Sequence, residues 1–291
     1  MNDLTIQPVD RVINALDKLT DENPGLERAV DFYEEVLPLM EQIRPSLHGL
    51  HLDMDEARVK LRQGVPLLWG EFSTAAGAEP NMELFMTLCR LATENGNEDG
   101  DVLMQAALHG DVDLRRMMAV ALRLERSELT AVARSLNIEL LTVESILRHL
   151  LMPIVQAYAG AFGQILDFAE WQQGYCPVCG DWPLFGELHG RDKLRHLRCG
   201  RCTVSWRFKR LECVWCGSTK RQELSFLYDP EAKSWRVDVC DHCRGYMKTL
   251  ASYDPLEADM LLVHDLETLY MDQFAADAGY RRPYKQPLAA P

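Results

Sequence analysis

The sequence predicts an α+β protein in which an all-α N-terminal domain, residues 1–170, precedes two small β modules and a C-terminal helix. Two observations predict this class. Helical periodicity dominates the first 170 residues, whereas residues 176–243 hold eight of the nine cysteines in four C-x-x-C pairs, separated by short strand-like runs. We expect the first β module at 171–211, the second at 212–252, and the C-terminal helix with a loose tail at 253–291.

The N-terminal half shows the apolar spacing of amphipathic helices. In NPGLERAVDFYEEVLPLMEQI, apolar residues recur at steps of four and three, which places them on one helical face. Asn23 suits the cap of this helix and Pro24 its first turn. PNMELFMTLCRLA predicts another helix by the same spacing, and SELTAVARSL predicts one with Ser127 as its cap. A long helix is expected from about Thr142 to Trp171.

Charge and hydropathy limit the compartment and the partners. The net charge of −13 disfavours contact with nucleic acid and anionic membranes. The start, MNDLTIQPVD, has neither the basic residues nor the apolar run of a secretory signal. The longest uncharged run, between Arg148 and Asp167, includes His149, Pro153 and two glutamines, so we expect a core helix rather than a membrane span. We therefore expect a cytoplasmic protein without membrane insertion, in a compartment that keeps thiols reduced.

The paired cysteines predict two metal sites. The pairs are Cys176/Cys179, Cys199/Cys202, Cys213/Cys216 and Cys240/Cys243. Two thiolates three residues apart in a tight turn point at one ion, and two such turns provide the sulfur tetrahedron that zinc and single iron ions prefer. A thioredoxin-type couple would need one pair near a βαβ pattern, and common ferredoxin clusters use other spacings. We predict that all eight cysteines bind two ions in closed sites, which are structural rather than catalytic.

The order of the pairs favours one pairing scheme. Sequential pairing gives C-x2-C-x19-C-x2-C and C-x2-C-x23-C-x2-C, in or close to the range of known four-cysteine sites. A cross-braced scheme, first pair with third and second with fourth, would also provide four ligands to each ion and remains an alternative. The runs LRHLRC, TVSWRFKRL and SWRVDVC predict strands. Modules of about 40 residues rarely fold without a metal, so binding and folding should be coupled.

The residue that follows each pair differs between turns. Glycine there permits the positive φ that the turn needs. Gly180 and Gly217 follow the first and third pairs, whereas Thr203 and Arg244 follow the second and fourth. We expect one ideal and one less ideal turn in each site. The form CPVCG is similar to rubredoxin turns and favours iron, although spacing alone does not separate iron from zinc.

A basic segment coincides with the cysteine pairs. Ten Lys and Arg residues lie between Arg191 and Arg221, against two acids. One hypothesis is a nucleic-acid-binding ribbon. Its contact residues would be Arg198, Arg201, Arg207, Lys209 and Arg210. The other hypothesis, favoured by the acidic remainder of the chain, is that these cations offset the thiolate charge locally. No phosphate loop, nucleophile motif or HExxH stands out in the sequence, so we expect no enzymatic activity.

Five segments between residues 175 and 280 carry a family likeness. They are YCPVCGDWP, LRHLRCGRC followed by VSW, KRLECVWCG, CDHCRGYMK and DPLEADMLLVHDLETLYMDQFAADAGY, with PLLW at 66–69 as a fainter echo. In order and spacing of all four pairs, the chain resembles the formate dehydrogenase accessory protein FdhE family.

The resemblance implies a function that the residues alone do not. It implies a cytoplasmic assembly factor that binds the molybdenum- and selenocysteine-containing catalytic subunit of a respiratory formate dehydrogenase before twin-arginine export. It also implies rubredoxin-like, iron-holding sites, carried here by the eight paired cysteines. The alternatives are a nucleic-acid-binding zinc ribbon and a rubredoxin-like electron-transfer or redox protein.

Overall fold

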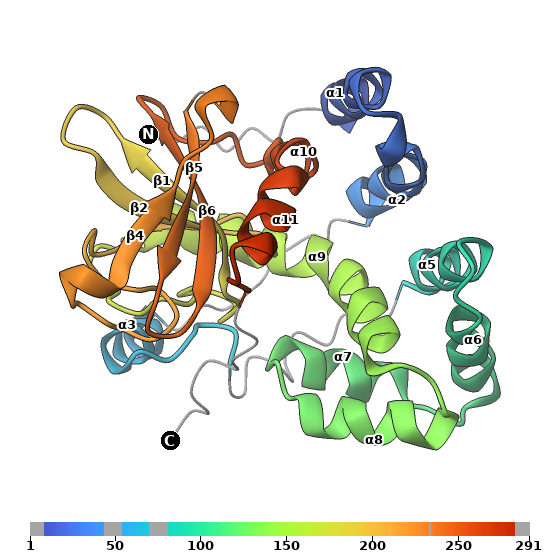
Figure 1. Ribbon diagram of the computed structural model, residues 1–291. Coiled ribbons are helices and arrows are strands. Elements are labelled where there is room, and N and C mark those ends of the chain that lie inside the picture. The colour runs from blue at the N-terminus through green and yellow to red at the C-terminus, as the bar shows by residue number, and fades with distance from the viewer. Residues whose placement is uncertain (1–8, 44–53, 70–80, 233, 283–291) are drawn as a thin grey trace. The chain divides into compact units, whose positions relative to one another are not determined.

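The computed structural model describes residues 9–43, 54–69, 81–232 and 234–282 (Figure 1). The chain divides into two compact units. The first comprises Met1–His51 and Leu68–Phe162, and the second comprises Leu52–Leu67 and Gly163–Pro291. The domain boundaries that the sequence suggested after residues 170, 211 and 252 stay predictions.

The described residues of the first unit are mainly helical, and a long stretch that includes part of the second unit separates α2 from the next helix of the first. The helices are α1 (Val9–Glu22), α2 (Glu27–Gln42), α5 (Met82–Glu94), α6 (Asp99–His109), α7 (Leu114–Leu122), α8 (Arg126–Leu136) and α9 (Leu140–Ile165), whose last three residues belong to the second unit. Consecutive helices pack in pairs, α1 with α2, α5 with α6 and α7 with α8 (Figure 1). The predicted all-α character of this half is therefore confirmed.

Two predicted caps are wrong. A short 3-10 turn, Pro24–Leu26, precedes α2, and the Asn23 side chain forms no capping bond to it. Helix α8 begins one residue before Ser127 with Glu125 at its cap position, so the serine lies inside the first turn. Propensity identified residues that suit a cap, but the course of the preceding chain decides where each helix begins.

Helix α9 ends earlier than predicted. It stops at Ile165, six residues before Trp171. Trp171 is buried, and its indole N–H donates to the Tyr175 carbonyl oxygen at 2.7 Å. This residue therefore packs within the second unit and does not continue the helix. Among the described residues, α9 is the one helix long and apolar enough to cross a membrane. Twelve of its residues are buried, which suits the interpretation as a core helix.

The second unit is built on one six-stranded sheet. Its strands are β1 (Pro183–His189), β2 (Leu194–Cys199), β3 (Ser205–Arg207), β4 (Leu224–Leu227), β5 (Trp235–Cys240) and β6 (Gly245–Ser252). Their order is β3-β2-β1-β6-β5-β4, and every neighbouring pair is antiparallel except β1 with β6. Each predicted ribbon is thus a three-stranded meander, and the parallel β1–β6 pair joins the two. The sequence predicted β2, β3 and β5, but not the joint sheet.

The second unit also contains helices that precede and follow the sheet in sequence. Helix α3 (Met54–Gln63) precedes it, and just after this helix the Gly64 carbonyl accepts from the Tyr175 hydroxyl at 2.7 Å. The C-terminal stretch expected to be one helix forms two, α10 (Leu261–Glu267) and α11 (Leu269–Asp277), with Thr268 between them. The core beneath α11 is formed by Ala232, Val237, Val239, Tyr246, Met271 and Ala275. The tail from residue 283 lies outside the described residues.

Candidate metal centres

The first cysteine cluster is fully buried. It comprises Cys176, Cys179, Cys199 and Cys202, which come from the turn before β1 and the turn after β2. The Sγ atoms of Cys176 and Cys202 lie 3.4 Å apart, and those of Cys179 and Cys199 lie 3.5 Å apart. A sulfur tetrahedron with metal–sulfur distances of about 2.3 Å has edges of roughly 3.8 Å. The cluster is therefore close to the size that a zinc or iron ion requires.

The second cluster repeats this arrangement nearer to solvent. It comprises Cys213, Cys216, Cys240 and Cys243, from the turn before β4 and the turn between β5 and β6. Its Sγ separations are 3.7 Å for Cys213 and Cys243, and 3.8 Å for Cys216 and Cys240. In each cluster all four sulfurs lie within 4.8 Å of one another. The cysteines are thus grouped in sequence order, as the favoured pairing scheme predicts, and not in the cross-braced one.

One backbone turn recurs in the clusters. The Cys176 N–H donates to the Asp181 carbonyl at 2.8 Å, and the Gly180 N–H donates back to the Cys176 carbonyl at 3.0 Å. The turns that begin at Cys199 and Cys213 contain the same two bonds. Four residues that follow the pairs have positive φ: Gly180 at 77°, Thr203 at 65°, Gly217 at 71° and Arg244 at 57°. The turns without glycine therefore adopt the same geometry as the others, with threonine and arginine held in the left-handed region.

Burial makes the thiolate form of four cluster cysteines costly. It raises the pKa of Cys176 and Cys202 well above the ordinary range, and it raises the pKa of Cys243 to about 11. Cys199 is different: although burial acts to raise its pKa, hydrogen bonds from neighbouring thiols and from the Cys202 N–H lower it. The pKa of Cys216 is lowered in the same way. A bound cation would supply the positive charge that favours the thiolate form at the cysteines whose pKa is raised.

Three arginines of the basic segment are buried beside the clusters. Arg195 and Arg198 are each 7% exposed and Arg201 is 2% exposed. Arg195 donates to the Glu212 carbonyl at 2.9 Å. Burial lowers the pKa of this arginine, and nearby anionic groups, the Cys213 sulfur among them, oppose that effect. Arg195 is thus placed to offset charge at Cys213, whereas Arg198 is paired with the Glu187 carboxylate at 2.7 Å.

The proposed nucleic-acid contacts are only partly on the surface. Of the five candidate residues, Arg198 and Arg201 are buried, and Lys209 is exposed but bonds to the Glu212 carboxylate at 2.9 Å. Arg207 and Arg210 are exposed. The five candidates therefore differ in exposure, and they do not form one exposed basic face.

A row of aromatic rings extends between the two clusters. Trp171 and Tyr175 have centroids 5.5 Å apart, Tyr175 and Trp182 are 6.0 Å apart, and Trp182 and Trp215 are 5.1 Å apart. Tyr175 precedes Cys176, and Trp215 lies within the third C-x-x-C turn. The row packs the first turn of one module against the first turn of the other, so the two sites share a core.

Sequence reasoning missed a buried carboxylate in the first module. Glu187 is 1% exposed, and its carboxylate accepts from Arg198 Nε at 2.7 Å, from His189 Nε2 at 2.8 Å and from the Leu256 N–H at 2.8 Å. Burial acts to raise its pKa, but the His189 bond and the Arg198 charge outweigh this and hold it at about 2. The available signal was an acidic residue within PLFGELH, on a strand that the sequence analysis did not identify.

The family models match both cluster modules. The model "FdhE, central domain" matches residues 175–210, and "FdhE, C-terminal domain" matches residues 211–289. The first range contains the whole first cluster, and the second range contains the whole second cluster together with α10 and α11.

Curated proteins named "Protein FdhE homolog" are similar to this chain. The Aquifex aeolicus protein is 24% identical over 92% of this chain and 90% of its own length. The Stutzerimonas stutzeri protein is 37% identical, over 41% of this chain and 39% of its own length. The Rhizobium meliloti protein is 30% identical over about half of each chain. For the latter two proteins, the similarity is thus confined to a part of each chain.

One solved structure has the same fold. The crystal structure of the FdhE protein from Pseudomonas aeruginosa superposes with a TM-score of 0.62, at 23% sequence identity, over 97% of this chain and 95% of that one. This match extends the likeness of fold to the helical half.

Proposed function

We propose that the chain, whose two cysteine modules match the central and C-terminal domains of FdhE, acts as an FdhE protein and assists the formation of an active respiratory formate dehydrogenase. In this proposal the protein binds the catalytic subunit in the cytoplasm, before twin-arginine export, and catalyses no reaction itself. The observation that carries the proposal is the coincidence of the two cysteine modules with the two FdhE family domains.

The proposal includes two resident metal ions. The ligands would be the four cysteines of each cluster, and the ion would hold the two turns of its module together. Four sulfurs within 4.8 Å of one another, in turns that repeat the same backbone bonds, support this assignment. We favour iron because the CPVCG turn is similar to rubredoxin turns, and zinc is the alternative since it also accepts four thiolates in a tetrahedron.

A pull-down from cells that respire on formate tests the function. The tagged chain should recover a formate dehydrogenase catalytic subunit, identified by mass spectrometry. The variant Cys89→Ser is a matched control, because Cys89 is buried in α5 and lies outside both clusters. Recovery with wild type and Cys89→Ser, but not with Cys213→Ser/Cys216→Ser, would support a metal-dependent accessory role. Absence of the subunit from the wild-type eluate would contradict the proposal.

Rubredoxin-like electron transfer is a second candidate, and one observation favours it. Cys216 and Cys243 are only partly buried, so a redox partner could approach the second cluster. This function needs iron with a reversible potential. Zinc at both sites in protein isolated from its native cells would exclude it. A nucleic-acid function has weaker support, because two of its five candidate residues are buried.

A further inference from the structure

Helix α11 carries both buried and exposed apolar residues. Met271 and Ala275 are fully buried against the sheet. Leu269, Tyr270 and Phe274 lie outside that core and are 49%, 49% and 39% exposed. Among the described helices and strands, α11 carries the largest number of exposed large apolar side chains, although it has only nine residues. A clustered apolar surface of this kind marks an interaction site more often than singly exposed residues do.

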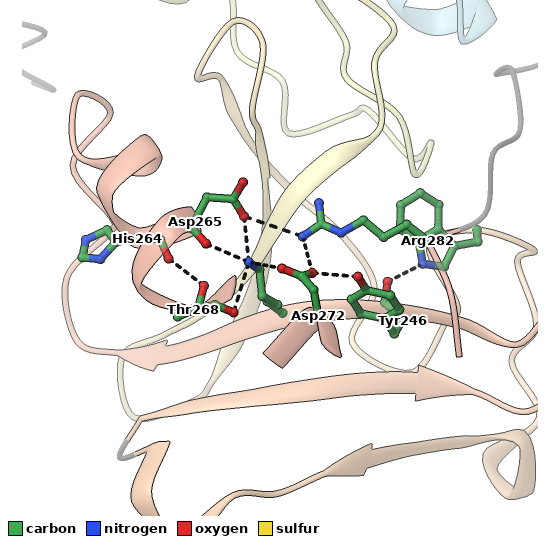
Figure 2. A network of polar contacts seen from close by, with 8 residues as sticks. Tyr246, His264, Asp265, Thr268, Asp272 and Arg282 are labelled. Atoms are coloured by element: carbon green, nitrogen blue, oxygen red, sulfur yellow. Dashed lines mark hydrogen bonds and ion pairs between the residues drawn. The ribbon is translucent and has the colours of Figure 1, made fainter. Parts of the chain in front are cut away.

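The inner face of α11 already holds the helix in place. Lys248 Nζ donates to Asp265 of α10 at 2.7 Å and to Asp272 of α11 at 2.8 Å. Figure 2 shows both aspartates in one polar network. The Tyr246 hydroxyl donates to Asp272 at 2.7 Å, and Arg282 donates to the same carboxylate at 3.2 Å. Lys248 is fully buried. Because these bonds and the apolar core anchor α11 from inside, its exposed side chains are not needed to hold it.

Acidic residues flank the exposed aromatic pair. Tyr270, Phe274 and Asp277 follow one another at spacings of four and three, which aligns them on one face of α11, and Glu267, the last residue of α10, precedes this helix. Glu267 and Asp277 are exposed, and they bond to a histidine and a glutamine, not to a lysine or arginine. No lysine or arginine occurs between Tyr253 and Ala278 in the sequence. Glu267 and Asp277 therefore place an acidic group near each end of this surface, and Arg244, which donates to the Ala278 and Gly279 carbonyls, is itself paired with Asp241.

We propose that the face of α11 formed by Tyr270, Phe274 and Asp277, together with Glu267 at the end of α10, binds an apolar segment of a partner protein that carries Lys or Arg at its ends. The inference rests on the proposed function, and the partner is the formate dehydrogenase catalytic subunit. Charge complementarity selects this occupant. A second copy of the chain would bring an identical acidic rim against this one, which like-charge repulsion disfavours.

The test measures affinity for purified formate dehydrogenase catalytic subunit by calorimetry, with the metal-loaded full chain. Tyr270→Ser/Phe274→Ser should weaken binding about tenfold or more, as expected for two exposed aromatic anchors. The control, Met82→Ser/Met86→Ser, alters an exposed apolar pair on α5, with residues 37% and 38% exposed. It should bind like wild type. Both variants should keep the wild-type melting temperature, since the altered side chains are on the surface.

A charge variant tests the nature of the segment. Glu267→Lys/Asp277→Lys should also weaken binding, and it should remove much of the salt dependence that wild type shows. Unchanged affinity of this variant would overturn the assignment of a basic segment.

Three further results would overturn the inference, each in a distinct way. Absence of binding by wild type would refute the proposed function together with the named partner. Wild-type binding that the serine variant retains would refute the α11 site alone. Self-association of wild type, lost in the serine variant while affinity for the subunit stays unchanged, would assign the face to a second copy of the chain.

Discussion

The two cysteine clusters have the same local architecture but different exposure. In both modules the chain forms a C-x-x-C turn, two strands, a second C-x-x-C turn and a further strand. The first cluster has no cysteine more than 1% exposed. In the second, Cys213 and Cys240 are buried while Cys216 and Cys243 are partly exposed. The turn geometry therefore does not determine how accessible a site is.

The neighbours of each turn account for the difference. At the first cluster, the chain after α3 lies against the turn: the Leu67 N–H donates to the Pro177 carbonyl at 2.9 Å, and Tyr175 bonds to Gly64. At the second cluster, the apolar neighbours are Trp182, Trp215 and Leu224, which belong to the strands and turns of the two β modules. We infer that an ion in the first site would be sealed inside the fold, whereas one in the second would be within reach of reagents and redox partners.

The largest expected effect comes from removing one turn's ligands. Cys176→Ser/Cys179→Ser and Cys213→Ser/Cys216→Ser should each retain one ion instead of two, measured by mass spectrometry of the metal content. A structural four-sulfur ion contributes roughly 10–16 kcal/mol of apparent binding energy in small modules, comparable to the whole stability of a domain. We expect the first variant to lose more stability, because its cluster is deeper. Equal losses of melting temperature would show that burial of the cluster has no bearing on its structural role.

A smaller effect is expected from replacing the buried Glu187 carboxylate on β1 of the first module. Glu187→Gln leaves Arg198 buried without its anionic partner, and it should cost about 3 kcal/mol of unfolding free energy at neutral pH. Urea unfolding of both proteins, each with its metal content verified, measures this. A loss below about 1 kcal/mol would show that the ion pair is compensated elsewhere.

The pH dependence of that difference has a defined sign. The pKa of Glu187 falls from 4.5 to about 2 on folding. Its contribution is therefore complete above pH 4.5 and disappears as the pH falls towards 2. The difference in stability between wild type and Glu187→Gln should shrink over that interval.

The difference in exposure predicts two rates of metal release. With a chelator in excess, the second site should lose its ion roughly tenfold faster than the first, which corresponds to about 1.4 kcal/mol less free energy for local opening. The fast phase, followed by a colorimetric chelator, should be absent from Cys213→Ser/Cys216→Ser. Release in a single phase, or a fast phase that survives in that variant, would contradict the assignment of the accessible site.

Much of the site could be predicted from the sequence because its information is local. Four repeats of C-x-x-C specify four turns, and loop lengths of 19 and 23 residues favour their sequential pairing. The strand LRHLRC coincides with β2. The helical half was predictable for the same reason, since apolar periodicity specifies an amphipathic helix without knowledge of its neighbours.

The remainder depends on contacts between distant residues. The parallel pairing of β1 with β6 joins residues about 60 positions apart, and no local pattern specifies it. The burial of Glu187 and Lys248 could not be predicted either, because a charged residue on a strand is expected on the solvent-facing side until its partners are known. The partners of Lys248, Asp265 and Asp272, lie on helices that follow the sheet in the chain.

The smallest expected effect concerns the two turns without glycine, where the same substitution should have opposite signs. Thr203 has φ of 65°, a conformation that costs a β-branched residue about 1–2 kcal/mol. Glycine relieves this strain but loses about 0.5–1 kcal/mol through the entropy of the unfolded chain. The bonds of Thr203 to Cys199 and Arg198 use its backbone and persist. Thr203→Gly should therefore stabilise the protein by roughly 0.5–1 kcal/mol.

Arg244 has φ of 57°, but its side chain contributes contacts that glycine cannot make. The guanidinium lies over the Tyr280 ring at 4.2 Å, and it donates to Asp241 at 2.8 Å and to the Gly279 carbonyl at 3.3 Å. One such stacking contact and one hydrogen bond together offset the relief of strain. Arg244→Gly should therefore destabilise the protein by about 1 kcal/mol, measured by urea unfolding beside Thr203→Gly. If both variants gained stability, the contacts between the second cluster's turn and the end of α11 would contribute little. If Thr203→Gly stabilises the protein and Arg244→Gly destabilises it, the contacts of Arg244 with the C-terminal segment stabilise the second cluster's turn.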